Sequence, residues 1–162
     1  MELDKLNITV IGAGIGGLAV ARALALRGAN VTVLEQAAEI SEVGAGLQIS
    51  PNGFAVLRAL GLGDALRRVA VQAKAVSLRD YRREEVLRLD LGSLDNDDYY
   101  FIHRADLIDI LAAGARAAGV LIRLLYKVFG VIPGARPKVE LANGARLCSD
   151  LVIGGYGLHS HA

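Results

Sequence analysis

Apolar residues along the first part of the chain predict a strand, a helix and a second strand. Residues 6–11 are rich in β-branched side chains and are followed directly by glycine, which is typical of a short buried strand. From residue 15 to 27 the apolar positions follow a helical spacing, and Gly28 is the residue type that commonly ends a helix. Residues 31–34 predict the next strand. Such a unit indicates a right-handed crossover between parallel strands.

The rest of the pattern predicts short helices, a hairpin and a group of short strands. Expected in order are an extended loop at 42–50, helices at 52–60 and 64–69, paired strands at 75–80 and 85–91, a polar loop at 95–98, a helix at 104–118, a strand at 120–125, antiparallel strands at 127–132, 138–141 and 146–147, and a fully buried strand at 151–153. Pro133-Gly134 and Asn143-Gly144 are turn signals between the antiparallel strands.

Together these elements predict an α/β chain with a Rossmann-like dinucleotide-binding fold. We expect a central parallel sheet with helices packed on it and a small antiparallel β-meander. Because 162 residues suit one domain, residues 1–162 are predicted to form a single domain.

Composition narrows the possible functions. The formal net charge of +1 argues against nucleic acid as a partner, because nucleic-acid binders concentrate positive charge. A lone cysteine, Cys148, excludes an internal disulfide, and it is expected to be a small buried hydrophobe. The uncharged, glycine-rich run at 8–21 is too short to span a bilayer, and the acidic start lacks a signal-peptide pattern, so we expect a cytoplasmic protein. A hydrophobic content of 53% suggests an apolar partner surface.

A glycine-rich turn between the first predicted strand and helix carries the main chemical signal. Gly12, Gly14 and Gly17 would let backbone approach a pyrophosphate, and the helix that begins at Ile15 offers free N–H groups and its positive dipole end. Glu35 follows the second strand and could accept hydrogen bonds from ribose hydroxyls while repelling a 2′-phosphate. The alternative is a turn that only packs helix on strand, with Glu35 at the surface.

Five motifs follow one another along the chain: Gly12 to Gly17, Leu34-Glu35-Gln36, the Gly44 to Asn52 segment, His103-Arg104-Ala105-Asp106-Leu107, and Asp150 to Gly154 with Gly157-Leu158-His159-Ser160. In this order they resemble class A flavoprotein monooxygenases of the salicylate and 3-hydroxybenzoate hydroxylase type. The resemblance covers the whole chain but only the first part of such an enzyme, and it implies FAD as cofactor.

The resemblance also implies individual cofactor contacts. Arg104 would lie against the FAD phosphates and ribityl chain, and the Gly44-Ala45-Gly46 backbone would pass beside the isoalloxazine. The backbone near Val128 would meet the adenine. Further candidate cofactor-binding residues are Gln36, Gln48, Tyr156 and Gly157. The alternatives are an exposed arginine paired with Asp106 and an ordinary glycine loop.

No metal site is expected. Asp95, Asp97 and Asp98 lack the glycine and distal glutamate of a calcium loop. His159 and His161 lack a third ligand.

Two departures from the family limit the expected activity. Family members carry aspartate where this chain has Tyr156, and a neutral phenol cannot supply a carboxylate's charge. The chain also stops at Ala162, so we expect it to be truncated before the substrate domain and to contain no catalytic residues for hydroxylation. The complete enzyme would use NAD(P)H and oxygen to hydroxylate an aromatic acid.

Two other functions remain open. The chain could be an NAD-dependent oxidoreductase domain that uses Glu35 to select the ribose. It could also be a non-catalytic module whose exposed apolar surface docks a separate chain carrying the substrate domain, or associates with itself.

Overall fold

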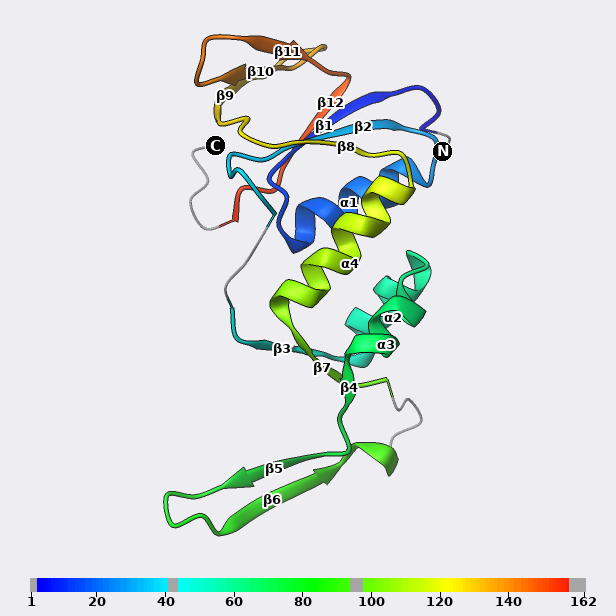
Figure 1. The fold of residues 1–162 in the computed structure, drawn as a ribbon, viewed down its shortest axis with the longest axis vertical. Helices are drawn as coiled ribbons and strands as arrows, with labels where there is room; N and C mark the ends of the chain where they lie inside the picture. Colours follow the sequence, from blue (N-terminus) through cyan, green and yellow to red (C-terminus); the bar gives the residue numbers. More distant parts are fainter. Residues whose placement is uncertain (1–2, 41–43, 94–97, 158–162) are drawn as a thin grey trace. The chain divides into compact units, whose positions relative to one another are not determined.

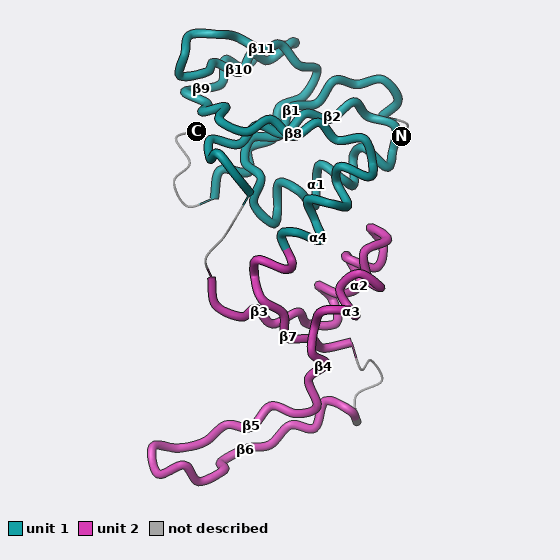
Figure 2. The backbone as a smooth tube through the Cα atoms, viewed as in Figure 1, with its two compact units in different colours: residues 1–42, 108–162 teal, residues 43–107 magenta. Residues whose placement is uncertain are grey.

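The computed structural model describes residues 3–40, 44–93 and 98–157. Contacts between Cα atoms divide the chain into two compact units, residues 1–42 with 108–162 (unit 1) and residues 43–107 (unit 2), coloured separately in Figure 2. The organisation of the chain as one domain stays a prediction.

Unit 1 contains a parallel sheet with strand order β12-β1-β2-β8 (Figure 1). Its strands are β12 (Leu151–Gly154), β1 (Asn7–Ile11), β2 (Asn30–Leu34) and β8 (Leu121–Arg123). Ile8 lies opposite Val31 on one side and Leu151 on the other, so β1 is central. β12 is an edge strand, and its residue Leu151 is 43% exposed. The prediction of a fully buried strand at 151–153 was therefore wrong.

Helix α1 (Ile15–Ala25) connects β1 to β2 as predicted, but it ends at Ala25 and not at residue 27 as expected. Leu18 and Ala21 are completely buried, so the small and apolar stripe of the helix faces the packed interior. Gly28 has a φ of +91° and donates its N–H to the carbonyl of Ala25 at 3.0 Å. The glycine ends the helix because a side chain is strained in that backbone conformation.

A three-stranded antiparallel sheet completes unit 1 in the order β11-β10-β9. Its strands are β9 (Val128–Ile132), β10 (Lys138–Leu141) and β11 (Arg146–Cys148). Val139 and Leu141 of β10 form a buried cluster with Ile11 and Leu34 of the parallel sheet. This cluster joins the two sheets, and the antiparallel pairing of β9, β10 and β11 confirms the predicted meander.

Cys148 corrects one expectation from the sequence. Its thiol is free and exposed, whereas Ser149 is buried and its hydroxyl lies 2.6 Å from that of Thr9. Ser149 and not Cys148 therefore occupies the buried position, and its hydroxyl forms a hydrogen bond with the hydroxyl of Thr9.

Unit 2 contains a small antiparallel sheet in the order β3-β7-β4 with two helices. The elements are β3 (Gly46–Ile49), α2 (Pro51–Ala59), α3 (Gly63–Val69), β4 (Val71–Gln72) and β7 (Tyr100–His103). Both helices were predicted. The loop predicted at 42–50 was wrong for Gly46–Ile49, because that segment pairs with β7 from Gly46 opposite His103 to Ile49 opposite Tyr100.

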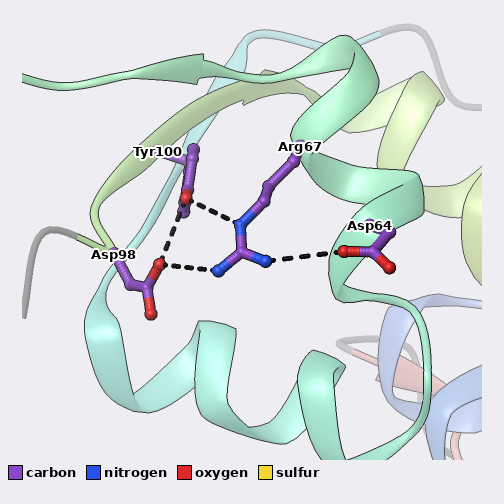
Figure 3. A network of polar contacts seen from close by, with 4 residues as sticks. All are labelled: Asp64, Arg67, Asp98 and Tyr100. Atoms are coloured by element: carbon purple, nitrogen blue, oxygen red, sulfur yellow. Dashed lines mark hydrogen bonds and ion pairs between the residues drawn. The ribbon is translucent and has the colours of Figure 1, made fainter.

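An unusually polar anchor holds α3 to the start of β7 (Figure 3). The guanidinium of Arg67 lies 3.3 Å from both the Tyr100 hydroxyl and the Asp98 carboxylate, and it stacks over the ring of Phe54 at 4.7 Å. Phe54 is fully buried and packs on Tyr100 with ring centroids 5.0 Å apart. The hydroxyl of Tyr100 and the carboxylate of Asp98 raise the pKa of Arg67. A further ion pair joins Arg67 to Asp64.

The predicted strand pair is an amphipathic hairpin of β5 (Ala75–Arg79) and β6 (Glu85–Asp90). Val76 lies opposite Leu89 and Leu78 opposite Leu87, so one face of the hairpin is apolar. The three leucines are about half exposed, at 48% to 56%. The short 3₁₀ turn η1 (Leu91–Ser93) follows.

The longest helix, α4 (Arg104–Ala117), directly follows β7 and continues into unit 1 at Ile108. Leu111 and Ala115 are completely buried. Gly119, with a φ of +86°, donates to the carbonyl of Arg116 at 2.9 Å and closes the helix as predicted. Within the described part of the chain, no helix is long and apolar enough to cross a membrane.

Candidate functional site

The turn after β1 requires glycine at two of its positions for steric reasons. Gly12 has a φ of +100°, and a Cβ added there would lie 2.4 Å from the carbonyl oxygen of Gly155. A Cβ on Gly17 would lie 2.0 Å from the carbonyl oxygen of Gly12. Neither distance can accommodate a side chain. The turn is therefore packed between the end of β12 and the first turn of α1.

Gly14 has a different role, because an added Cβ there would meet no atom within 4 Å. It precedes α1 in an extended conformation, with a φ of −73° and a ψ of −179°. The first bond of this helix runs from the N–H of Leu18 to the carbonyl of Gly14 at 2.9 Å. The N–H groups at the start of the helix, including that of Ile15, precede this bond, and no acidic side chain lies in the first turn. This geometry suits an anion.

Glu35 is fixed at the carboxyl end of β2 by two backbone N–H groups. The amide of Ala13 donates to Oε2 at 2.8 Å, and the amide of Ala37 donates to Oε1 at 2.9 Å. Each carboxylate oxygen can accept a further hydrogen bond. The half-buried carboxylate is thus oriented beside the glycine turn, as the sequence spacing predicts. Gln36 follows it and is exposed.

A pocket of about 120 Å³ lies directly at this turn. It is lined by Ala13, Gly14, Glu35, Ala37, Glu39, Ile40 and Ile108. Backbone donors of the turn and the Glu35 carboxylate share this pocket. The arrangement can hold a phosphate-linked ribose, with anion-binding amides on one side and a hydroxyl acceptor on the other.

A second set of predicted residues lies in unit 2. An added Cβ on Gly44 would lie 3.2 Å from Cδ and 3.3 Å from Cβ of Arg104, so the glycine backbone packs closely on the arginine stem. Arg104 is half-buried and begins α4. Ala45 is exposed beside them. Gly46 is paired with His103, and a Cβ added to it would lie 3.8 Å from the carbonyl oxygen of Ile102, which is an ordinary contact distance.

Gln48 and Val128 are engaged in contacts within the fold. Gln48 accepts a hydrogen bond from the Tyr99 hydroxyl at 2.7 Å, between β3 and the residue preceding β7. Val128 is the first residue of β9, and its side chain packs against the buried cluster of unit 1. Its backbone remains the part of the residue predicted to meet a ligand.

Tyr156 has an inward-packing role that a carboxylate could not take. Its ring packs on the cluster that contains Ile11 and Leu34, and its Cε2 would lie 3.1 Å from a Cβ on Gly154. Burial raises the pKa of the Tyr156 phenol. The ring is therefore neutral at physiological pH. Gly157 follows with a φ of +68° and is exposed.

Three residues of the unit 1 site were not identified from sequence as candidates. Ala13 and Ala37 contribute backbone amides to Glu35, and Gly155 contributes the carbonyl that closes on Gly12. Backbone contacts of alanine leave no side-chain pattern. Gly155 lies in the glycine-rich stretch after β12, and that stretch is the only signal that could have identified it.

The candidate metal ligands do not assemble within the described residues. No group of three or more His, Cys, Asp or Glu side chains there could hold a metal ion. Asp98 binds Arg67 and Tyr100 instead. Asp95, Asp97, His159 and His161, with the family motif residues Leu158 and Ser160, lie outside the described residues.

The parallel sheet, the glycine turn and the oriented glutamate define a dinucleotide-binding protein of Rossmann type. The family model described as FAD binding domain matches residues 5–162. The chain belongs to this family, and it represents the FAD-binding region of class A flavoprotein monooxygenases. FAD is its cofactor, as the resemblance predicted.

Two curated relatives are aromatic hydroxylases by name. The chain is 38% identical over 160 residues to 3-amino-4-hydroxybenzoate 2-monooxygenase of Streptomyces cremeus. The aligned region covers 96% of this chain and 40% of the relative. It is 36% identical over 163 residues to 3-hydroxybenzoate 6-hydroxylase 1 of Aquipseudomonas alcaligenes, with 96% and 41% covered. The chain therefore spans about two fifths of the length of these relatives.

Solved structures agree with the fold. The solved structure of the tetrameric form of 2-methyl-3-hydroxypyridine-5-carboxylic acid oxygenase superposes with a TM-score of 0.83 at 28% identity. The match covers 91% of this chain and 38% of the other. The predicted Rossmann-like α/β class is confirmed.

Proposed function

We propose that unit 1 binds the adenosine diphosphate half of FAD at the turn formed by Gly12, Gly14 and Gly17. The main support is that this turn and Glu35 line the same pocket. The Ala13 amide in the turn donates a hydrogen bond to Glu35 Oε2 at 2.8 Å. In this proposal the amides at the start of α1 bind the pyrophosphate, and Glu35 accepts the ribose hydroxyls.

The residues present fit this cofactor. The open space above Gly14 leaves room for a phosphate close to the backbone, and the first turn of α1 has no acidic side chain that would repel it. Glu35 keeps acceptor capacity because each oxygen receives only one of the two backbone N–H groups. A carboxylate at this position also disfavours a 2′-phosphate, which agrees with FAD.

We also propose cofactor contacts for residues of unit 2, considered by itself. Arg104 would neutralise phosphate charge and contact the ribityl chain, and the backbone of Gly44, Ala45 and Gly46 would lie beside the isoalloxazine. The support is the close packing of Gly44 on the Arg104 stem, which makes a larger residue unfavourable there. When bound, the flavin supplies the redox chemistry, while these residues orient it and exclude water.

Remaining members of the candidate set have smaller proposed roles. The backbones of Gln36 and Val128 would flank the adenine, and Gln48 would support the strand that carries Gly46. Tyr156 and Gly157 would lie near the cofactor through their backbone, since the Tyr156 ring packs inward on the core cluster.

For the whole protein we propose hydroxylation of an aromatic acid with NAD(P)H and oxygen in the cytoplasm. The support is the naming of the relatives as benzoate hydroxylases and monooxygenases. The present chain spans about two fifths of those relatives, so the reaction is proposed for the longer enzyme and not for this region by itself.

FAD titration tests the binding proposal. We expect purified protein to retain a yellow chromophore or to be stabilised by added FAD, by about 2.7 kcal/mol at a concentration 100-fold above the dissociation constant. NADH, titrated in parallel, tests the alternative of a nicotinamide-binding domain. Tighter binding of NADH than of FAD, or no chromophore and no thermal shift with saturating FAD, would reject the proposal.

The hairpin supports a second candidate role, docking of the chain that carries the substrate domain. On its apolar face, Val76 is half-buried, while Leu78, Leu87 and Leu89 are 48% to 56% exposed. An isolated two-stranded hairpin is also marginal in water without a packing partner. A monodisperse monomer that binds no hydrophobic dye would contradict this role.

A further inference from the structure

Leu125 combines two unfavourable features at one position. Its backbone is left-handed, with a φ of +62°, and its side chain is 73% exposed. Bulky side chains are rarely found in this conformation because Cβ crowds the following carbonyl. Among the described residues other than glycine, Lys5 and Arg83 also have positive φ, but both carry charged side chains suited to solvent. The leucine is the apolar exception.

Backbone hydrogen bonds place Leu125 directly beside the proposed adenosine pocket. Its N–H donates to the carbonyl of Ala37 at 3.0 Å, and the N–H of Tyr126 donates to the carbonyl of Glu35 at 2.8 Å. Glu35 and Ala37 both line the pocket. The turn between β8 and β9 is therefore joined to the end of β2, where the ribose-binding carboxylate lies.

Inward packing does not explain the leucine. The neighbouring Tyr126 packs on the buried cluster, and the guanidinium of Arg123 covers the ring of Tyr126 at 5.5 Å. Asparagine or glycine would adopt the left-handed conformation with less strain and would expose no apolar surface. Strain of this kind persists where the surrounding structure enforces it, and it occurs frequently at ligand sites.

We infer that Leu125 is an adenine-contacting residue, whose apolar side chain covers the base next to the Glu35 carboxylate. The inference rests on the proposed binding of the FAD adenosine in unit 1. It identifies the adenine as the part of the ligand that benefits from the leucine, because the base is the flat, weakly hydrated group attached to the ribose. The side chain gains cover when the cofactor binds and is exposed otherwise.

Two variants separate this role from a structural one. Leu125→Gly and Leu125→Asn both relieve the left-handed strain and remove the apolar contact. We expect each to weaken binding of FAD and of ADP by the same factor, about tenfold, as burial of a leucine predicts. The unfolding midpoint of the ligand-free protein should stay equal or rise. Leu121→Ala, at the opposite end of β8 and 50% exposed, is the matched control and should bind both ligands as the unaltered chain does.

Each outcome gives a clear decision. Unchanged FAD and ADP affinities in both Leu125 variants, with binding intact in the unaltered chain, would overturn the inference and leave the proposed function standing. A loss of affinity that parallels a lower unfolding midpoint would mark a structural role and also overturn it. If the unaltered chain binds neither FAD nor ADP, the proposed function fails together with the inference.

Discussion

Gly16 and Gly17 are adjacent in the first turn of α1, yet a methyl group should act in opposite directions at the two positions. A Cβ on Gly17 would lie 2.0 Å from the carbonyl oxygen of Gly12, whereas one on Gly16 would meet no atom within 4 Å. Gly17→Ala is expected to destabilise the ligand-free protein by about 3 kcal/mol, because the β1–α1 contact must open. Gly16→Ala should be neutral or stabilise by about 0.5 kcal/mol, since alanine favours the helix. Urea unfolding measures both, and similar costs would contradict this account of the turn.

At Tyr156 the expected effect depends on pH. Burial raises the pKa of this phenol above its ordinary value of 10.0. The folded state then retains the proton more tightly than the unfolded state, so the stabilising contribution is complete below pH 10 and is lost as pH rises through the folded-state pKa. The urea midpoint of the unaltered chain should therefore fall relative to that of Tyr156→Phe as the pH rises above 10. Parallel curves from pH 8 to 11 would show that the phenol does not titrate differently on folding.

Between elements, the two ion pairs of Arg67 provide an internal comparison of exposed and shielded contacts. The Asp64 side chain is 87% exposed, whereas Asp98 is 22% exposed and also accepts a hydrogen bond from the Tyr100 hydroxyl. Solvent screens the first pair more than the second. Asp98→Asn should lower the urea midpoint clearly, and Asp64→Asn should change it little. The reverse order would refute the view that this contact anchors α3 to β7.

Elements with a regular spacing of apolar residues were predictable from the sequence, whereas elements that depend on pairing with a segment distant in the sequence were not. The helix at 104–118 has a regular apolar pattern over about four turns, and glycine marks its end. By contrast, Gly46–Ile49 is a strand because β7 pairs with it, and four residues of mixed polarity carry too short a pattern. The site divides in the same way, since the glycine turn and Glu35 have a spacing signal while the Ala13 and Ala37 amides have none.

For the molecule as a whole, we predict that this chain alone does not carry out coupled hydroxylation. It spans about two fifths of the length of its hydroxylase relatives, and the residues proposed here bind and orient the cofactor. With FAD, NADH and a hydroxybenzoate, oxygen consumption should release hydrogen peroxide or be undetectable. Product analysis by chromatography measures this. Hydroxylated product in a one-to-one ratio with NADH oxidised would disprove the prediction.

The contact between Gly12 and Gly155 also has a consequence for synthesis of the protein on the ribosome. β1 emerges early, but its partner strand β12 comes much later, and the Asn7–Asp150 bond that accompanies their pairing joins residues 143 positions apart. At roughly 5–20 residues per second, the glycine turn waits on the order of ten seconds for the carbonyl that closes on it. During that interval one edge of β1 is unpaired, which makes the nascent chain vulnerable to aggregation. Slow codons before β12 should therefore lower the yield of folded protein more than slow codons placed after it.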